Sequence, residues 1–224
     1  PHFWSMLSMK KKQNEIPTVN FGLLGEENYV TDYIQVHNPK LRRIAKRLRG
    51  KTNDQIITAV ARYVARNIKY PLDRHGKPTA ATHTKCFKWW NGLYLTDVDF
   101  DYGWLFPNQV VASEVKRGIC FSSACLCTSL LRINHVEAFT VLGVVLKKGK
   151  RILGFHAWTE TVRTSGDRVV IETTVHPKPA KLIPAKEIYG GALPVTYDPL
   201  AWLNEAGYAE DKSKVKKYGK ALNA

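Results

Sequence analysis

One cysteine in this chain stands where a protein can place a nucleophile. Cys120 follows Gly118 and Ile119 at the predicted start of a helix that runs to Leu131. The first turn of a helix presents unpaired N–H groups and the positive end of the helix dipole, and both favour a thiolate over a thiol. The same N–H groups could hold an oxyanion. The chemistry expected at Cys120 is attack of its sulfur on a carbonyl carbon.

A nucleophilic cysteine needs a base and a group that orients the base. His156 lies in the middle of a predicted strand, and Glu172 lies in the next strand. Because side chains alternate along a strand, we expect both residues on one face of the sheet. The helix is expected to pack across that face and bring Cys120 to His156, and Glu172 is expected to accept the Nδ1–H of the ring.

Each of these residues also has a structural interpretation. A buried cysteine is often a small hydrophobic residue, a strand histidine is often held by structural hydrogen bonds, and Glu172 could be an exposed strand residue. The order of a Cys on a helix, a His on a strand and an acid on the next strand favours the catalytic interpretation.

The elements that must position these residues follow from hydrophobic periodicity and turn residues. Helical spacing of apolar residues predicts helices over 38–50, 52–70 and 120–131. Strand patterns then cover 136–146, 152–163 and 169–175, with glycine-containing turns between them. Helices followed by antiparallel strands predict an α+β domain.

These segments resemble the transglutaminase-like superfamily, whose members have papain-related folds with Cys, His and Asp in that chain order. The resemblance runs from about Asp54 to Thr174. It rests on segments that follow the family's order: Val64–Tyr70, then Trp104, Pro107 and Lys116–Cys120, then Leu130–Arg132 and Val136–Ala138, then Gly143, and finally His156–Glu160. The resemblance implies N-terminal helices and a Cys-bearing helix packed on an antiparallel sheet, and it implies a Cys-His-acid triad.

The sequence departs from the family pattern at two positions. Phe121 stands where the family usually has an Asp after the Cys, and Glu172, before Thr173 and Thr174, stands where the third catalytic residue is usually Asp. Glu is one methylene longer than Asp. We therefore expect the strand to shift, or the side chain to fold back, for Glu172 to reach the imidazole.

Four further residues are candidates for the surroundings of the site. Gln109 or Asn108 could supply a side-chain donor to the oxyanion hole beside the Cys120 N–H, although both could equally cap a short turn. Trp104 and Trp158 are candidate pocket walls, with core aromatic residues as the alternative.

The other cysteines point neither to disulfides nor to a metal. Cys125 and Cys127 lie on one helix and cannot bridge each other in place. Cys86, with His83, lacks a second pair of ligands at zinc spacing, so no metal site and no cofactor are expected. A reducing compartment fits this use of cysteine.

The amino-acid composition excludes some classes of protein. The 224 residues include 34 Lys and Arg against 19 Asp and Glu, a net charge of +15, and 44% are hydrophobic. That apolar content excludes disorder of the whole chain. No apolar run approaches the roughly 20 residues that cross a bilayer. The lysines follow the apolar start at residues 3–9, which is the wrong order for a secretory signal, so we expect a soluble protein of the cytoplasm or of a virion.

The charge is concentrated outside the catalytic candidates. We expect an N-terminal extension over 1–37, the transglutaminase-like domain over 38–200, and a basic helical tail over 201–224. The basic face of residues 40–49 and the C-terminal lysines are either solvated surfaces or docks for an acidic partner. Nucleic acid is the least favoured partner, because the sequence contains no recognised nucleic-acid motif.

The residues and the resemblance together predict a cysteine hydrolase or acyltransferase that acts on a protein or peptide amide, including cell-wall peptides. Water is favoured over an amine as acyl acceptor, because small members of the superfamily resemble peptidases more often than cross-linking enzymes. The alternative is a non-catalytic structural or binding module on the same fold, which docks through its basic surface.

Overall fold

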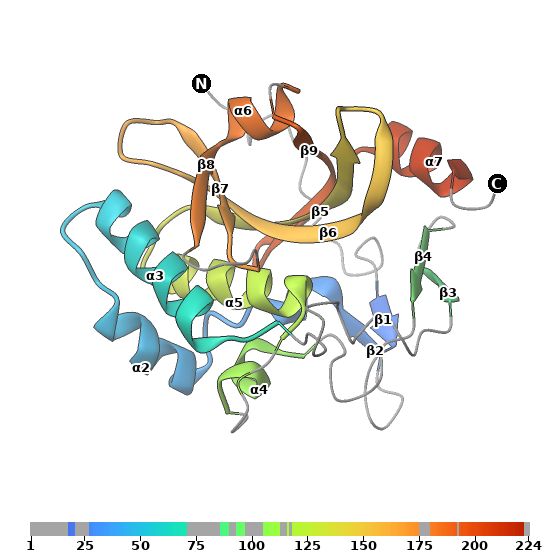
Figure 1. Ribbon diagram of the computed structural model, residues 1–224. Coiled ribbons are helices and arrows are strands. Elements are labelled where there is room, and N and C mark those ends of the chain that lie inside the picture. Colours follow the sequence, from blue (N-terminus) through green and yellow to red (C-terminus); the bar gives the residue numbers. More distant parts are fainter. Residues whose placement is uncertain are drawn as a thin grey trace.

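The structure is a computed structural model, and it describes residues 18–20, 27–70, 86–89, 93–96, 105–112, 116, 118–174, 180–191 and 193–221. Its centre is a curled antiparallel sheet. Helix α5 packs on one side of the sheet with other helices packed against it, and a short helix, α6, lies on the other side (Figure 1). The predicted α+β class, with a Cys-bearing helix packed on an antiparallel sheet, is confirmed.

The helices begin where the sequence supplies caps. The helices of the described residues are η2 (Val30–Tyr33), α2 (Pro39–Arg47), α3 (Asn53–Asn67), α4 (Pro107–Ala112), α5 (Cys120–Ile133), α6 (Ala185–Tyr189) and α7 (Lys212–Ala221). The Asn38 side chain accepts from the N–H groups of Lys40 and Leu41 at the start of α2. The Thr52 hydroxyl accepts from the N–H of Gln55 at the start of α3.

The main sheet has the strand order β10-β9-β5-β6-β7-β8, and every neighbouring pair is antiparallel. Its strands are β5 (Ala138–Lys147), β6 (Arg151–Val162), β7 (Arg168–Glu172), β8 (Lys181–Pro184), β9 (Val195–Asn204) and β10 (Gly207–Glu210). The three predicted strands are β5, β6 and β7. Two short antiparallel pairs lie outside this sheet: β1 (Thr18–Asn20) with β2 (Glu27–Tyr29), and β3 (Cys86–Trp89) with β4 (Leu93–Thr96).

Strand β9 contains a proline at a position that is central in the sheet order. Periodicity does not predict this strand, because Pro199 interrupts its pattern and proline is disfavoured in central strands. The structure accommodates Pro199 at a bulge, where Leu142 pairs with Ala201 but Gly143 pairs with Pro199, so that Leu200 is the extra residue. β10 pairs only with residues 201–204, so no described strand flanks Pro199 on that edge.

The two faces of the sheet belong to different cores. On the helix side, Ala157 of β6 packs with Ala124 of α5, and the Thr159 hydroxyl donates to the Ala124 carbonyl at 3.0 Å. On the other side, Trp158 packs with Val170 and with residues of α6 and β9. Alternation along β6 therefore divides its side chains between the α5 side and the α6 side of the sheet.

Both predicted flanking segments enter the body of the protein. Val30 and Tyr33, which fall in the predicted extension, are buried against α5, and Tyr33 stacks on Phe106 with ring centroids 4.3 Å apart. The predicted tail from residue 201 includes the end of β9 and all of β10, which are hydrogen-bonded in the main sheet. The boundary at residue 200 is therefore wrong, because it cuts through β9.

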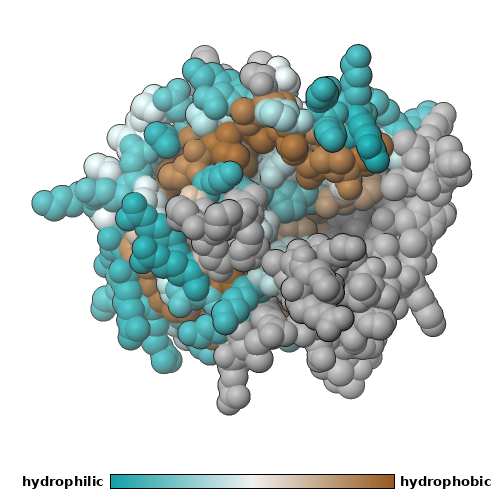
Figure 2. All heavy atoms as spheres, viewed as in Figure 1, coloured by the Kyte–Doolittle hydropathy of each residue, from teal (hydrophilic) through white to brown (hydrophobic). Residues whose placement is uncertain are grey.

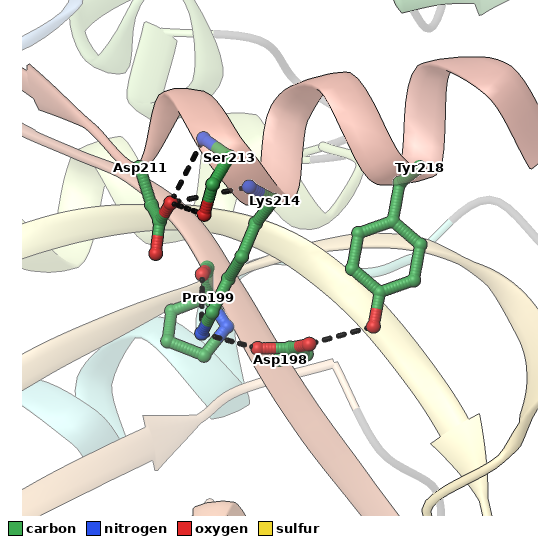
Figure 3. A network of polar contacts seen from close by, with 6 residues as sticks. All are labelled: Asp198, Pro199, Asp211, Ser213, Lys214 and Tyr218. Atoms are coloured by element: carbon green, nitrogen blue, oxygen red, sulfur yellow. Dashed lines mark hydrogen bonds and ion pairs between the residues drawn. The ribbon is translucent and has the colours of Figure 1, made fainter.

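Helix α7 is docked on the body rather than free in solvent. Its Val215 and Tyr218 are buried. Lys214 Nζ lies 2.5 Å from one oxygen of Asp198, and the Tyr218 hydroxyl donates to the other at 2.6 Å (Figure 3). Asp211 caps the helix by accepting from the N–H groups of Ser213 and Lys214. The helix is thus anchored to Asp198 of β9.

Candidate active site

Cys120 is the first residue of α5. Gly118, two residues before it, lies in a tightly packed place, because a Cβ there would be 3.2 Å from the Ser122 Cβ and 3.4 Å from the Ile68 side chain. The Gly118 N–H donates to the Lys69 carbonyl at 3.1 Å, which ties this approach to the end of α3. Cys120 itself is partly exposed. The local fold therefore presents a reachable sulfur at a helix N-terminus.

His156 and Glu172 form a close pair. The His156 Nε2 lies 2.6 Å from the Glu172 Oε2, and Glu172 is only 1% exposed. The expected Nδ1 contact is wrong, because Nε2 makes it, and this leaves Nδ1 as the ring nitrogen for other partners. The Cys120 thiol is near enough to His156 to raise the pKa of the ring. The structure thus places His156 and Glu172 in direct contact, with Cys120 in their surroundings.

The expected packing of the helix across the His156 face is also wrong. The His156 ring lies beside Trp158 and Tyr197, with ring centroids 6.2 and 5.5 Å away, so it occupies the side opposite α5. Strand β7 pairs with β6 only from Thr159 onward, and His156 lies beyond that ladder. Cys120 therefore approaches His156 at the end of α5, past the end of β7, rather than across the face of the sheet.

Glu172 is held by donors on both oxygens. The N–H and hydroxyl of Thr174 donate to Oε1 at 2.7 and 2.6 Å. The Tyr197 hydroxyl donates to Oε2 at 2.8 Å, and this is the same oxygen that contacts His156. These donors fold the longer side chain back toward its own strand end and fix it beside the imidazole.

The pair is charged at neutral pH. Burial disfavours the imidazolium, but the charge of Glu172 and hydrogen bonds with Cys120 and Glu172 outweigh it and raise the pKa of His156 to about 10. Burial raises the pKa of Glu172, but the His156 charge and the hydrogen bonds from His156 and Thr174 outweigh it and lower this pKa to about 2. Both pKa shifts favour the imidazolium–carboxylate form of this half-buried pair.

Trp158 packs next to this pair. It is 1% exposed, so it is a core residue and not the wall of an open pocket. Its ring centroid lies 4.7 Å from that of Tyr197, and its Nε1–H donates to the Tyr189 hydroxyl at 2.8 Å. A Cβ on Gly143 would collide with the Trp158 ring, so this glycine gives the ring its room. Gly143 pairs directly with His156 across the β5–β6 ladder.

The oxyanion candidates lie on α4, which packs against α5. The Gln109 Oε1 accepts from the Phe106 N–H at 2.8 Å, so this side chain caps its own turn. The Asn108 N–H donates to Gln35 at 3.0 Å, and its Oδ1 is buried without a hydrogen-bond partner. Trp104 lies outside the described residues.

The other two cysteines of α5 are expected to be less reactive than Cys120. Cys125 and Cys127 are fully buried, and burial raises the pKa of the Cys127 thiol to about 12 and that of Cys125 further still. Cys86 belongs to β3, and its side chain lies outside the described part of the chain, as does His83. Within that part, no three His, Cys, Asp or Glu residues gather as a metal site would require, and no helix has the length and apolarity to cross a membrane.

Sequence reasoning missed three residues around the pair. Tyr197 lies on the unpredicted strand β9. Thr174 follows Glu172 closely, and its local hydrogen bonds are of the kind that Thr side chains favour, which is a signal the sequence did contain. Tyr70 is partly buried near the site, and burial, with the charges of Cys120 and Glu172, raises its pKa.

The chain matches the model of a known family. The model of a family described as a transglutaminase-like domain matches residues 39–180. A solved structure of a proposed cysteine protease from Cytophaga hutchinsonii is similar over 74% of this chain, with 16% identity and a TM-score of 0.41. The chain spans about half of that protein, 47% of its length. No curated protein resembles the chain significantly in sequence.

Proposed function

The chain belongs to the transglutaminase-like domain family, and from this we propose that it is a cysteine hydrolase or acyltransferase acting on an amide bond. One observation carries the proposal: His156 contacts the buried Glu172 at 2.6 Å, and the Cys120 thiol is near enough to raise the pKa of the same ring. A structural module has no need to keep a charged pair buried beside a partly exposed thiol.

In the proposed reaction the proton of the Cys120 thiol has already passed to the His156 ring, so the reaction starts from a thiolate beside an imidazolium. The Sγ then attacks the amide carbonyl, a C–S bond forms, and the oxyanion is held by backbone N–H groups at the start of α5. The imidazolium gives its proton to the leaving amine as the C–N bond breaks. Water then attacks the thioester, His156 takes its proton, and the acid leaves as the thiol is restored.

The structural surroundings suit these roles. Glu172 holds the Nε2 side of the ring, so the Nδ1 side is free to serve Cys120. We favour water over an amine as acyl acceptor, as the resemblance to small peptidase-like members implies, and we propose a protein or peptide amide, including cell-wall peptides, as substrate.

An acyl-enzyme trap tests the proposal. The full chain is incubated with p-nitrophenyl acetate, quenched in acid and digested, and the acetylated cysteine is identified by mass spectrometry. We expect acetyl on Cys120, and loss of the p-nitrophenolate burst in Cys120→Ala but not in the matched variant Cys127→Ala, which changes a buried thiol of the same helix. A burst that persists in Cys120→Ala would refute the role of this residue.

A second candidate function, docking on an acidic partner, rests on the surface of α2 and α3. Residues 39–70 contain ten basic residues and one acidic residue, a net charge of +9. All ten basic residues are exposed, and none forms an ion pair within the described residues. Hydrophilic side chains cover this region of the molecule (Figure 2).

We propose that this face recruits acidic proteins, either for a non-catalytic module or for the enzyme itself. The alkylation rate of Cys120 with iodoacetamide against pH separates the two. A thiol that titrates near its free value, about 8.5, supports the non-catalytic module. Rapid alkylation well below that pH supports the enzyme.

A further inference from the structure

Tyr197 contacts Glu172 from a distant strand of the sheet. It lies in β9, three strands from Glu172 in the sheet order, and the curl of the sheet brings its hydroxyl to Glu172. The donor is 2.8 Å from Oε2 and the Tyr197 side of this contact is buried. Its ring also packs edge-on against the His156 ring, 5.5 Å away.

Two donors therefore compete for one carboxylate oxygen. The Glu172 Oε2 meets the His156 Nε2 at 2.6 Å and the Tyr197 hydroxyl at 2.8 Å, while Oε1 is served by Thr174 alone. Each donor draws negative charge toward itself, so a carboxylate oxygen with two donors attracts either one less strongly than an oxygen with one.

We propose that Tyr197 is a positioning residue that shares the charge of Glu172 and so limits how strongly His156 holds its proton. This inference rests on the proposed function, in which the imidazolium must release a proton to the leaving amine. An imidazole that binds its proton too tightly is a poor general acid, so a second donor on Glu172 keeps the ring able to give the proton up.

Tyr197 is held in place by contacts that its neighbour Asp198 makes outside the site. The next residue, Asp198, accepts from Lys214 and Tyr218 of α7, so the backbone of β9 beside Tyr197 is anchored to that helix (Figure 3). On the inner side, the Asp198 carbonyl lies 2.5 Å from where a Cβ on Gly143 would be, so β9 lies close against β5 here. The hydroxyl therefore has little freedom to leave Glu172.

The chain contains a matched control. Tyr189 donates to the Oε2 of another buried glutamate, Glu160, at 2.8 Å, the same distance as the Tyr197 contact. Trp158 packs near both tyrosine rings. Tyr197→Phe and Tyr189→Phe each remove one Tyr–Glu hydrogen bond and keep the ring, but only the first touches the oxygen that serves His156.

The experiment is an NMR titration of the His156 ring in the full chain labelled with ¹⁵N-histidine, with the signal assigned by His156→Gln. The other titratable groups facing the ring are Cys120 on α5, Glu172 on β7 and Tyr70 after α3, and all three stay unchanged in both variants. We expect Tyr197→Phe to move the His156 midpoint upward by about 0.5 pH units or more. Tyr189→Phe should leave the midpoint where it is in the wild type.

A midpoint that falls or does not move in Tyr197→Phe overturns the inference and leaves the proposed function intact. A wild-type His156 that titrates near its ordinary value, about 6.5, overturns both, because the ring is then not paired as the proposal requires. If Tyr197→Phe does not fold, Thr174→Val decides. It removes one donor from the other Glu172 oxygen, so it must also raise the midpoint, and an unchanged value contradicts charge sharing.

Discussion

Two buried glutamates on neighbouring strands show how differently this protein uses one residue type. Glu160 on β6 and Glu172 on β7 are 0% and 1% exposed, and each accepts from a tyrosine hydroxyl at 2.8 Å and pairs with a basic side chain. Yet burial raises the pKa of Glu160 despite the Arg168 charge and the hydrogen bonds on this carboxylate, whereas the His156 charge and hydrogen bonds from His156 and Thr174 outweigh burial and lower the pKa of Glu172 to about 2. Similar burial thus gives opposite pKa shifts in the two carboxylates.

The surroundings of the two sites explain the difference. Glu160 is paired with Arg168 and joined to α6 through Tyr189, so its network ties the sheet to that helix. Glu172 faces His156 and, beyond it, Cys120. The buried carboxylate of Glu160 thus stabilises the fold, whereas that of Glu172 orients a candidate base. Trp158 lies between the two sites, because it donates to Tyr189 and packs against Tyr197.

Replacing the two glutamates in turn gives the largest expected contrast. Glu172→Gln should lower the acylation rate of Cys120 by about 10³-fold, because a glutamine amide can donate to Nε2 and favour the wrong ring tautomer. Glu160→Gln should change that rate by only a few fold. The measurement is the p-nitrophenolate burst at neutral pH, and equal losses in both variants would mean that the two sites are not functionally distinct.

For the free energy of unfolding, we expect Glu160 to matter more than it does for the acylation rate. Glu160→Gln leaves Arg168 without its carboxylate and should lower the free energy of unfolding by about 2 kcal/mol, since Arg168 is partly exposed and solvent compensates in part. Urea denaturation followed by tryptophan fluorescence measures this loss. A variant as stable as the wild type would show that the network does not hold α6 to the sheet.

The way that stability depends on pH should also have opposite signs for Glu172 and Glu160. The folded-state pKa of Glu172 is below its ordinary value of 4.5, so its contribution is present above 4.5 and is lost as pH falls toward about 2. The His156 contribution is complete below 6.5 and is lost as pH rises through about 10. The free energy that Glu172→Gln removes should therefore be greatest between pH 4.5 and 6.5.

Glu160 should behave in the opposite way. Because its pKa is raised in the folded state, ionisation above pH 4.5 costs stability, and the penalty of Glu160→Gln should shrink as pH rises. Denaturation curves of both variants across pH 3–8 provide the comparison. Parallel pH profiles for the two variants would contradict the assignment of opposite shifts.

The last comparison disturbs Trp158, which lies near both sites. Gly143→Ala places a methyl group against the Trp158 ring and should cost about 1–3 kcal/mol, because the core there is already filled. The control is Gly149→Ala, where nothing lies within 4 Å and only the positive φ of 68° is strained. We also expect Gly143→Ala to alter the His156 titration, whereas Gly149→Ala should not.

Much of this arrangement could be predicted from the sequence. Strong periodicity and cap residues located α2, α3, α5 and the strands β5 to β7. The candidate triad followed from the order of Cys120, His156 and Glu172. Alternation placed His156 and Glu172 together, but it could not show which side of the sheet α5 would cover, because that depends on how helix and sheet pack in three dimensions.

What escaped prediction has a physical cause. Strand β9 carries Asp198 and Pro199 in its middle, and only the bulge opposite Gly143 makes such a strand possible. Tyr197 therefore had no predicted strand to place it. The choice of Nε2 over Nδ1 depends on the rotation of the His156 ring, which no sequence pattern encodes.

The position of β9 has a consequence for the order in which the site is completed during synthesis. A ribosome makes the chain from its N-terminus, so Cys120 and His156 emerge well before Tyr197 and before the helix that anchors Asp198. The nascent chain can assemble α5 against β5 and β6 while Glu172 still lacks its last donor. Strand β9 thus leaves the ribosome after α5, β5, β6 and β7, and the set of contacts on Glu172 is complete only once this strand has been made.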